Sequence, residues 1–154
     1  MKKILIASVL TITGIFCMNA NAATATGGFN VAVSLQSACL IGTIPAIPIS
    51  YTSFQTAAVD ANVTFTVKCT NTQGYSMAIN TGTGAASGIS YLLSLGTASA
   101  TGITAAVLTL GGQTGTGLIQ NFVISATAAG SQGGSTASST PVAVNDARVL
   151  TVTY

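Results

Sequence analysis

The sequence predicts an all-β protein built as an antiparallel sandwich. Apolar and polar residues alternate with a period of two in most apolar stretches, which is the pattern of strands with one buried face. Turn-forming residues separate these stretches at short intervals, and no stretch shows a convincing helical period. Many short strands with turns between them favour two packed antiparallel sheets.

Four stretches carry the alternation most clearly. In each of them every second residue is apolar and the residues between are mostly Thr, Ser, Asn, Ala, Gln or Lys. They are Phe29–Leu35, Val63–Cys69, Tyr75–Ile79 and Leu150–Tyr154. Further β-like stretches are expected at Ile47–Phe54, Ile89–Leu95, Ile103–Leu110 and Leu118–Ala126.

Glycine and proline mark the connections. Gly82-Thr83-Gly84 and Gly111-Gly112 supply residues that tolerate a positive φ in turns. Pro45 and Pro48 would interrupt a sheet ladder and indicate an edge or an irregular entry. Gly130–Thr140 is rich in Gly, Ser, Thr and Ala with no apolar period, and it predicts a long flexible loop.

The start of the chain predicts export. Lys2 and Lys3 precede an apolar stretch from Ile4 to Met18, and Ala20-Asn21-Ala22 provides the small residues of a cleavage site. This is the pattern of a secretory leader, and the apolar stretch is too short for a comfortable membrane span. We expect a signal peptide over residues 1–22, removed before Ala23 together with Cys17.

Charged side chains are scarce in the expected mature chain. Lys68 and Arg148 oppose Asp60 and Asp146, so the side-chain charge over the remaining 132 residues sums to zero. Soluble domains usually carry about 25% charged residues, and a surface with so few charges is poorly protected against association. One interpretation is a soluble domain rich in Thr, Ser and Asn; the other is that much of the surface contacts another subunit. No basic patch is present, which argues against nucleic acid as a partner.

Two cysteines remain after the leader. In an exported chain, Cys39 and Cys69 are expected to form a disulfide. In the chain-entropy model, closing a loop of this length stabilises the fold by about 3–4 kcal/mol.

Few residues of the expected mature chain could take part in catalysis. The mature chain has no His, Glu or Trp, so acid–base catalysis would depend on two Asp residues, one Lys or the tyrosines. One cysteine pair without histidine does not match a zinc site, and no glycine stretch continues into the Lys-Ser/Thr of a phosphate-binding loop. We expect no enzymatic activity, no metal and no cofactor.

The segment after the cleavage site allows two interpretations. Its odd-numbered residues share one face, and these are Ala25, Gly27, Phe29, Val31 and Val33. The segment is either an ordinary first strand or a strand that leaves its own domain and completes the sheet of a neighbour. Burying apolar side chains would contribute about 1.5–3 kcal/mol each. Ordering a flexible tail offsets part of this.

Three stretches together resemble a known family. They are YTSFQTAAVDANVTFTVKCTNTQGYSMAINTGTG over residues 51–84, the strand GGFNVAVSLQSAC before it, and the ending NDARVLTVTY. Their order is similar to that of the Spore Coat Protein U domain, which is shared by subunits of archaic chaperone–usher pili. The resemblance implies an incomplete immunoglobulin-like sandwich that is completed by donor-strand exchange, with the donor segment over residues 23–35 and the domain over residues 36–154.

The resemblance also implies partners and residue roles. A periplasmic chaperone lends the missing strand, an outer-membrane usher exports the subunit, and a neighbouring pilus subunit then supplies its own N-terminal segment. The donor face would be Ala25, Gly27, Phe29, Val31 and Val33, and Cys39 with Cys69 match the family's disulfide. The acceptor and chaperone-pairing strand would carry Leu150, Val152 and Tyr154.

The ending departs from the family pattern in one place. The family usually has Tyr-x-Asp-x-Leu before the last alternating residues. Here Asp146 is kept, whereas Val144 and Arg148 stand at the Tyr and Leu positions.

The expected function is that of a structural subunit of a surface pilus (fimbrium) in adhesion or biofilm formation. The alternative is a small outer-membrane β-barrel, favoured by an alternating final strand that ends in Tyr154. The few aromatic residues, too few for two interfacial girdles, argue against the barrel. A free-standing carbohydrate-binding sandwich is a third possibility, but it lacks an evident aromatic platform.

Overall fold

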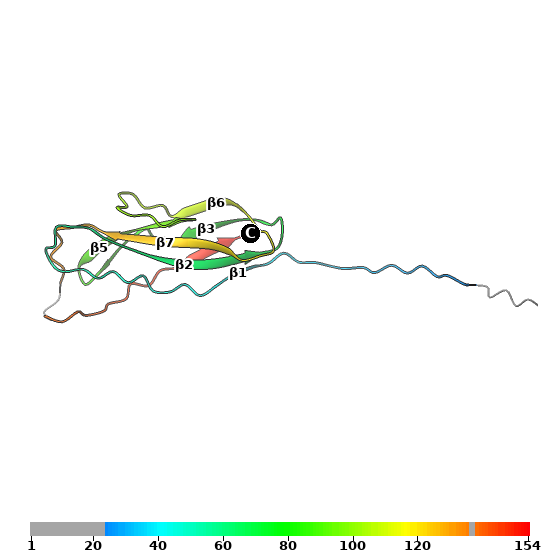
Figure 1. Ribbon diagram of the computed structural model, residues 1–154, viewed down its shortest axis with the longest axis horizontal. Coiled ribbons are helices and arrows are strands. Elements are labelled where there is room, and N and C mark those ends of the chain that lie inside the picture. The colour runs from blue at the N-terminus through cyan, green and yellow to red at the C-terminus, as the bar shows by residue number, and fades with distance from the viewer. Residues whose placement is uncertain (1–23, 136–137) are drawn as a thin grey trace, which may run out of the picture. The chain divides into compact units, whose positions relative to one another are not determined.

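A computed structural model describes residues 24–135 and 138–154 (Figure 1). The expected leader over residues 1–22 lies outside the described residues. The chain divides into two units, of which the first ends at Ser34 and the second comprises Leu35–Tyr154. None of the described residues forms a helix long and apolar enough to cross a membrane.

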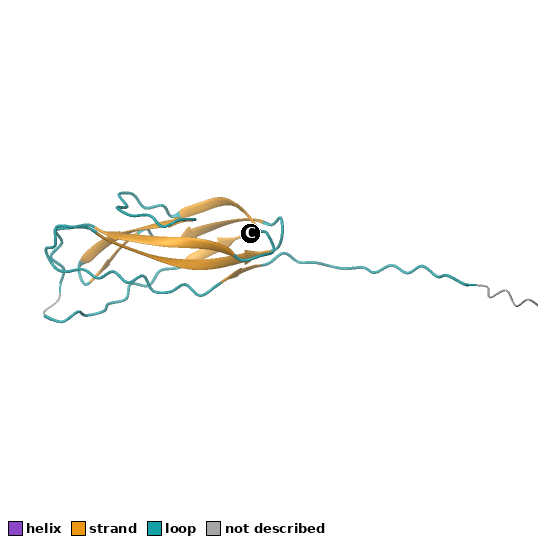
Figure 2. Ribbon diagram, in the orientation of Figure 1, coloured by secondary structure: helices purple, strands orange, loops and turns teal. Residues whose placement is uncertain are grey.

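The second unit is an antiparallel β-sandwich, which confirms the fold class expected from the sequence (Figure 2). One sheet has the strand order β1-β2-β7-β5-β4 and the other has the order β6-β3-β8. The strands are β1 (Cys39–Ile41), β2 (Val59–Cys69), β3 (Gly74–Ile79), β4 (Thr83–Ala86), β5 (Ile89–Gly96), β6 (Thr109–Thr114), β7 (Gln120–Ala128) and β8 (Leu150–Thr153).

The core lies between the two sheets and follows the predicted alternation. Phe65, Val67 and Cys69 of β2 are buried, whereas Lys68 between them is exposed. On the opposite sheet, Tyr75, Met77 and Ile79 of β3 are buried as predicted. Phe122 of β7 links the two layers: its ring centroid lies 5.8 Å from that of Phe65 and 6.4 Å from that of Tyr75.

Strand β7 is buried on both faces because a loop covers its outer face. Ser125 and Thr127, which point away from the core, are buried. The backbone N–H of Ala100 donates to Ser125 Oγ at 2.9 Å, and that of Ile103 donates to Thr127 Oγ1 at 3.0 Å. The strand predicted at Ile103–Leu110 is therefore wrong for most of its length, since regular pairing begins only at Thr109.

Two further expectations are corrected. Residues 47–54 form no strand; Ile47 and Ile49 pack against the core without a ladder, in the segment that Pro45 and Pro48 interrupt. The first half of the predicted flexible loop at Gly130–Thr140 is anchored by hydrogen bonds. Gln132 accepts through Oε1 from Ser90 N at 2.7 Å, and its Nε2 donates to Ser90 O at 2.9 Å.

The sandwich is closed on one side and open on the other. On the closed side, Leu95 N of β5 donates to Val107 O at 2.9 Å, and Ile79 N of β3 donates to Leu108 O at 2.9 Å. The segment before β6 therefore joins the two sheets, because it bonds β3 and the part of β5 that β4 does not pair. The strand order then leaves β1 and β8 on the opposite side, each paired with only one neighbour among the described residues.

The burial of Phe122 predicts a strong effect on stability. Phe122 is 2% exposed and Phe54 is 76% exposed. Phe122→Ala should lower the free energy of unfolding by about 3–5 kcal/mol through lost burial and a cavity. Phe54→Ala, the matched control, should change it by no more than about 0.5 kcal/mol. Urea unfolding of both variants measures the difference, and equal losses would contradict the assigned core.

Candidate functional site

The free edge of β8 is the first part of the candidate site. Leu150 lies opposite Ile79 and Val152 opposite Met77, so β8 is held by β3 alone. Leu150 and Val152 pack against the core but are only half-buried, whereas their partners on β3 are buried. The inward face of β8 is thus incompletely covered, and its outer main-chain groups have no strand partner within the described chain. Tyr154 follows the strand and is exposed.

The free edge of β1 is the second part. Cys39 lies directly opposite Cys69 in the β1–β2 ladder, and the predicted disulfide between them is confirmed. Their Cα atoms are 4.1 Å apart, so the disulfide clamps the three-residue strand to its neighbour. Leu40 and Ile41 are nevertheless exposed. The strand is therefore fixed at one end while its outer edge stays unpaired.

A polar cluster holds the chain where it enters β8. Asp146 and Arg148 form an ion pair, and the Tyr91 hydroxyl donates to Asp146 Oδ2 at 2.8 Å. Arg148 Nε donates to the Tyr91 hydroxyl at 3.2 Å, and the guanidinium carbon lies 5.7 Å from the centroid of the Tyr91 ring. Because Tyr91 belongs to β5, the cluster ties the entry of β8 to the opposite sheet.

Neighbouring contacts complete this attachment. The Ala85 backbone N–H donates to Asp146 Oδ2 at 3.3 Å, and Asn80 N donates to Val149 O at 3.0 Å. A Cβ at Gly84 would collide with Arg148 Nη2 and the Tyr91 hydroxyl, so a larger residue there would have to displace these side chains. Sequence reasoning noted Arg148 as a departure but missed the cluster. The available signal was that two of the four mature charges stand two residues apart.

The cluster shifts the pKa of its members. The hydrogen bond from Tyr91, together with the charge and hydrogen bond of Arg148, lowers the pKa of Asp146 below its ordinary value of 3.8. Burial raises the pKa of the Tyr91 hydroxyl. The cluster therefore contains a charged carboxylate and a neutral phenol at neutral pH.

The N-terminal segment, which belongs to the first unit and is described by itself, is a further candidate functional feature. Residues 24–34 form no strand, and Phe29, Val31 and Val33 are 86%, 75% and 84% exposed. An added Cβ at Gly27 or Gly28 would meet no atom within 4 Å. The strand predicted at Phe29–Leu35 is therefore not formed within the single chain. Its alternating apolar face remains uncovered, and the donor role expected for it remains a prediction.

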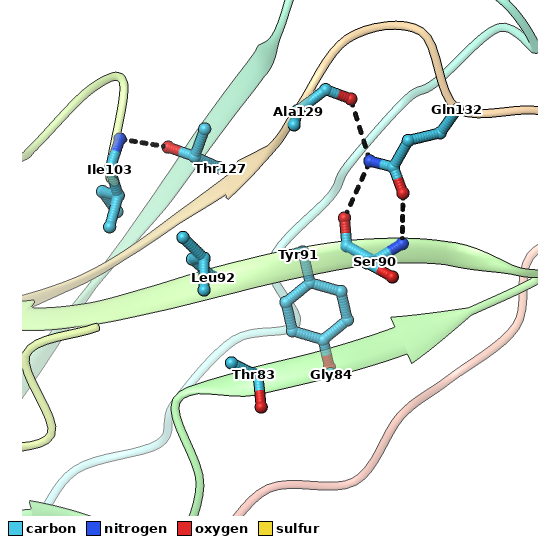
Figure 3. A pocket seen from close by; sticks show the side chains of 9 residues that line it. All are labelled: Thr83, Gly84, Ser90, Tyr91, Leu92, Ile103, Thr127, Ala129 and Gln132. Atoms are coloured by element: carbon cyan, nitrogen blue, oxygen red, sulfur yellow. Dashed lines mark hydrogen bonds between the residues drawn. The ribbon is translucent and has the colours of Figure 1, made fainter. Parts of the chain in front are cut away.

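A shallow pocket on the outer side of the larger sheet is a weaker candidate for a functional site than the strand edges (Figure 3). Its polar side chains already serve the fold: Gln132 bonds to Ser90 and Ala129, and Thr127 bonds to Ile103 and Asp60. Among the described residues, no buried side-chain N or O atom lacks a hydrogen-bond partner. The same part of the chain contains no group of three or more His, Cys, Asp or Glu residues that could hold a metal ion.

Comparison with known families agrees with these features. The Spore Coat Protein U domain matches residues 25–107, which is 83 of the 154 residues. The chain belongs to this family. The match begins within the exposed N-terminal segment and continues through β5, so it covers the disulfide and most of the larger sheet. No curated protein and no solved structure matches the chain. The Spore Coat Protein U family is one of structural subunits of the pilus or coat type.

The Asp146 cluster predicts a specific response to pH. The pKa of Asp146 is lowered in the folded state, so its contribution to stability is present above pH 3.8 and is lost as the pH falls through the lower folded pKa. Tyr91→Phe removes the largest cause of the shift and should move the pKa of Asp146 back toward 3.8. Carboxyl-carbon NMR titration measures this value.

Tyr51→Phe serves as the matched control for this titration. The Tyr51 hydroxyl bonds Gln55 O and Gln132 N, and it makes no hydrogen bond to Asp146. This variant should leave the Asp146 titration unchanged. If Tyr91→Phe also left it unchanged, the cluster would not control this carboxyl group.

Proposed function

We propose that this chain is a structural subunit of a chaperone–usher surface pilus that polymerises by donor-strand complementation. One observation supports this best. The chain contains an edge strand that is paired on one side only and whose apolar side chains are half-buried, and it also contains an exposed segment in which every second residue is apolar. The edge is β8 with Leu150 and Val152, and the segment carries Phe29, Val31 and Val33. The edge lacks a pairing strand, and the segment lacks a surface that covers its apolar face.

Two kinds of interaction would hold such a joint between molecules, and one cost would oppose them. Burial of Phe29, Val31 and Val33 at about 1.5–3 kcal/mol each would be added to the newly buried parts of Leu150 and Val152. A ladder to β8 would also satisfy main-chain groups that now face solvent. The conformational entropy lost when the segment becomes ordered opposes this gain. A joint of this kind needs the full alternating segment to be stable.

The scarcity of charge agrees with assembly. Of the four charged side chains in the expected mature chain, Asp146 and Arg148 neutralise each other. Little charge remains to keep exposed apolar edges of two subunits apart. Before assembly, a periplasmic chaperone would cover the β8 edge, and an outer-membrane usher would then pass the subunit to the surface. The resulting fibre would serve adhesion or biofilm formation.

Removal of the donor segment tests the mechanism directly. A variant lacking residues 23–33, produced behind the same leader, should still bind the chaperone because β1 and β8 are unchanged. It should not become an internal subunit of a fibre, because it offers no strand to a neighbour. Co-purification with the chaperone and electron microscopy of surface fibres measure the two properties. Polymerisation equal to that of the intact chain would end this proposal.

The phase of the donor face provides a finer test. Val31→Asp places a charge on the face that would be buried, whereas Asn30→Asp places the same charge on the opposite face. A buried unpaired carboxylate costs several kcal/mol. Val31→Asp should therefore reduce the yield of fibres by about tenfold or more. Asn30→Asp should leave the yield close to that of the intact chain, and equal losses would show that the assigned phase is wrong.

A further inference from the structure

Three exposed apolar side chains gather at one end of the sandwich, outside the donor segment and the β8 edge. They are Leu40, Leu118 and Ile119, which we call the end patch; they are 68%, 71% and 65% exposed. Leu40 belongs to β1, and the other two lie in the loop between β6 and β7. Residues far apart in the sequence thus expose large apolar groups in one region.

The sheet register brings these residues together. Leu40 pairs with Lys68 in the β1–β2 ladder, and Gln120, which follows Ile119, pairs with Val67 in the β2–β7 ladder. Gly117 N donates to Cys69 O at 3.1 Å, which holds the β6–β7 loop against the end of β2. A shallow depression lined by Leu40, Lys68 and Gly117 joins the two sides. Leu40 and the loop that carries Leu118 and Ile119 therefore lie at the same end of the larger sheet, near Lys68.

The end patch lies where the donor segment is attached. The chain enters β1 at Cys39, so only residues 34–38 separate Val33 from the sandwich. Even fully extended, the chain from Val33 to Cys39 spans at most about 20 Å. The place where a neighbouring domain holds Val33 must therefore lie within this distance of Cys39, the residue before Leu40 of the end patch.

We propose that the end patch docks onto the neighbouring copy of this chain that receives its donor segment, which adds a domain–domain contact to the donor-strand joint. This inference rests on the proposed function. The short tether places the neighbour close to this surface. The surface carries little charge that would have to be desolvated on docking, since Lys68 is the only charged residue that lines the depression. The contact restrains the angle between successive subunits, since domains joined only by a linker move freely unless an apolar interface holds them.

Thiol accessibility within assembled fibres tests this contact. Leu118→Cys reports on the end patch, and Thr64→Cys reports on an exposed position within β2 as the matched control. Cys39 and Cys69 are disulfide-bonded, so only the introduced thiol reacts with a maleimide. Rates are divided by the rate of the same variant unfolded in urea. In fibres, Leu118→Cys should react about tenfold or more slowly, while Thr64→Cys stays close to its unfolded rate.

Other outcomes overturn the proposal in distinguishable ways. Equal, unprotected rates in intact fibres would show that no neighbour covers the end patch, while leaving donor-strand assembly standing. Protection of both positions would indicate side-by-side bundling of fibres. Protection of Leu118→Cys only in the chaperone complex would assign the patch to the chaperone. If the intact chain formed no fibres at all, the proposed function itself would fail.

A second variant separates the end patch from the donor joint. Leu118→Ser combined with Ile119→Ser leaves residues 23–35 and β8 unchanged, so fibres should still assemble. Their persistence length in electron micrographs should fall by about twofold or more, because only the donor strand and its tether then restrain the joint. An unchanged persistence length would overturn the proposed contact.

Discussion

The unpaired edge of β8 is the constraint on which the rest of the molecule depends. Its main-chain donors and acceptors face outward, and Leu150 and Val152 reach the core without being fully covered. Natural sheets usually protect such an edge with charges, a proline, a bulge or a covering loop. Here the exposed side chains within the strand are Thr151 and Thr153, which give none of this protection. The edge therefore offers a place where a further strand can pair.

Both free edges are nevertheless held firmly at their ends. The disulfide fixes the first residue of β1 to β2, and the Tyr91–Asp146–Arg148 cluster ties the entry of β8 to β5. These attachments act along the chain direction and leave the hydrogen-bonding sides of the strands open. Contacts within the subunit therefore offset the conformational entropy that the edge strands lose when they become ordered. In the proposed assembly, only the incoming strand would lose further conformational entropy.

The sequence predicted the elements whose alternation faces a single core. β2 and β3 appear where the period of two placed them, and β5 and most of β7 appear where further β-like stretches were expected; each has one face against the opposite sheet. The sequence did not predict that a loop covers the outer face of β7, because the burial of Ser125 and Thr127 depends on backbone N–H donors of that distant loop. Ile47 and Ile49 show the reverse error: they are buried in part by packing alone, where proline prevents a ladder. The Asp146 cluster was missed because no short-range pattern relates Tyr91 to Arg148.

Phe29–Leu35 has the same alternation as β2, yet its side chains are exposed. The difference lies in the availability of a partner strand, and the direction of the chain bears on where the proposed partner could come from. β8 runs toward the end of the sandwich where Cys39 lies opposite Cys69, because Thr153 pairs with Ser76 near the start of β3. If the segment paired with β8 of its own chain, its link to Cys39 would make it run toward the same end, parallel to β8. A segment donated to a neighbour is free to pair antiparallel, which is the more stable arrangement per residue. In the proposed assembly, the connection at β1 therefore favours exchange between subunits over closure within one.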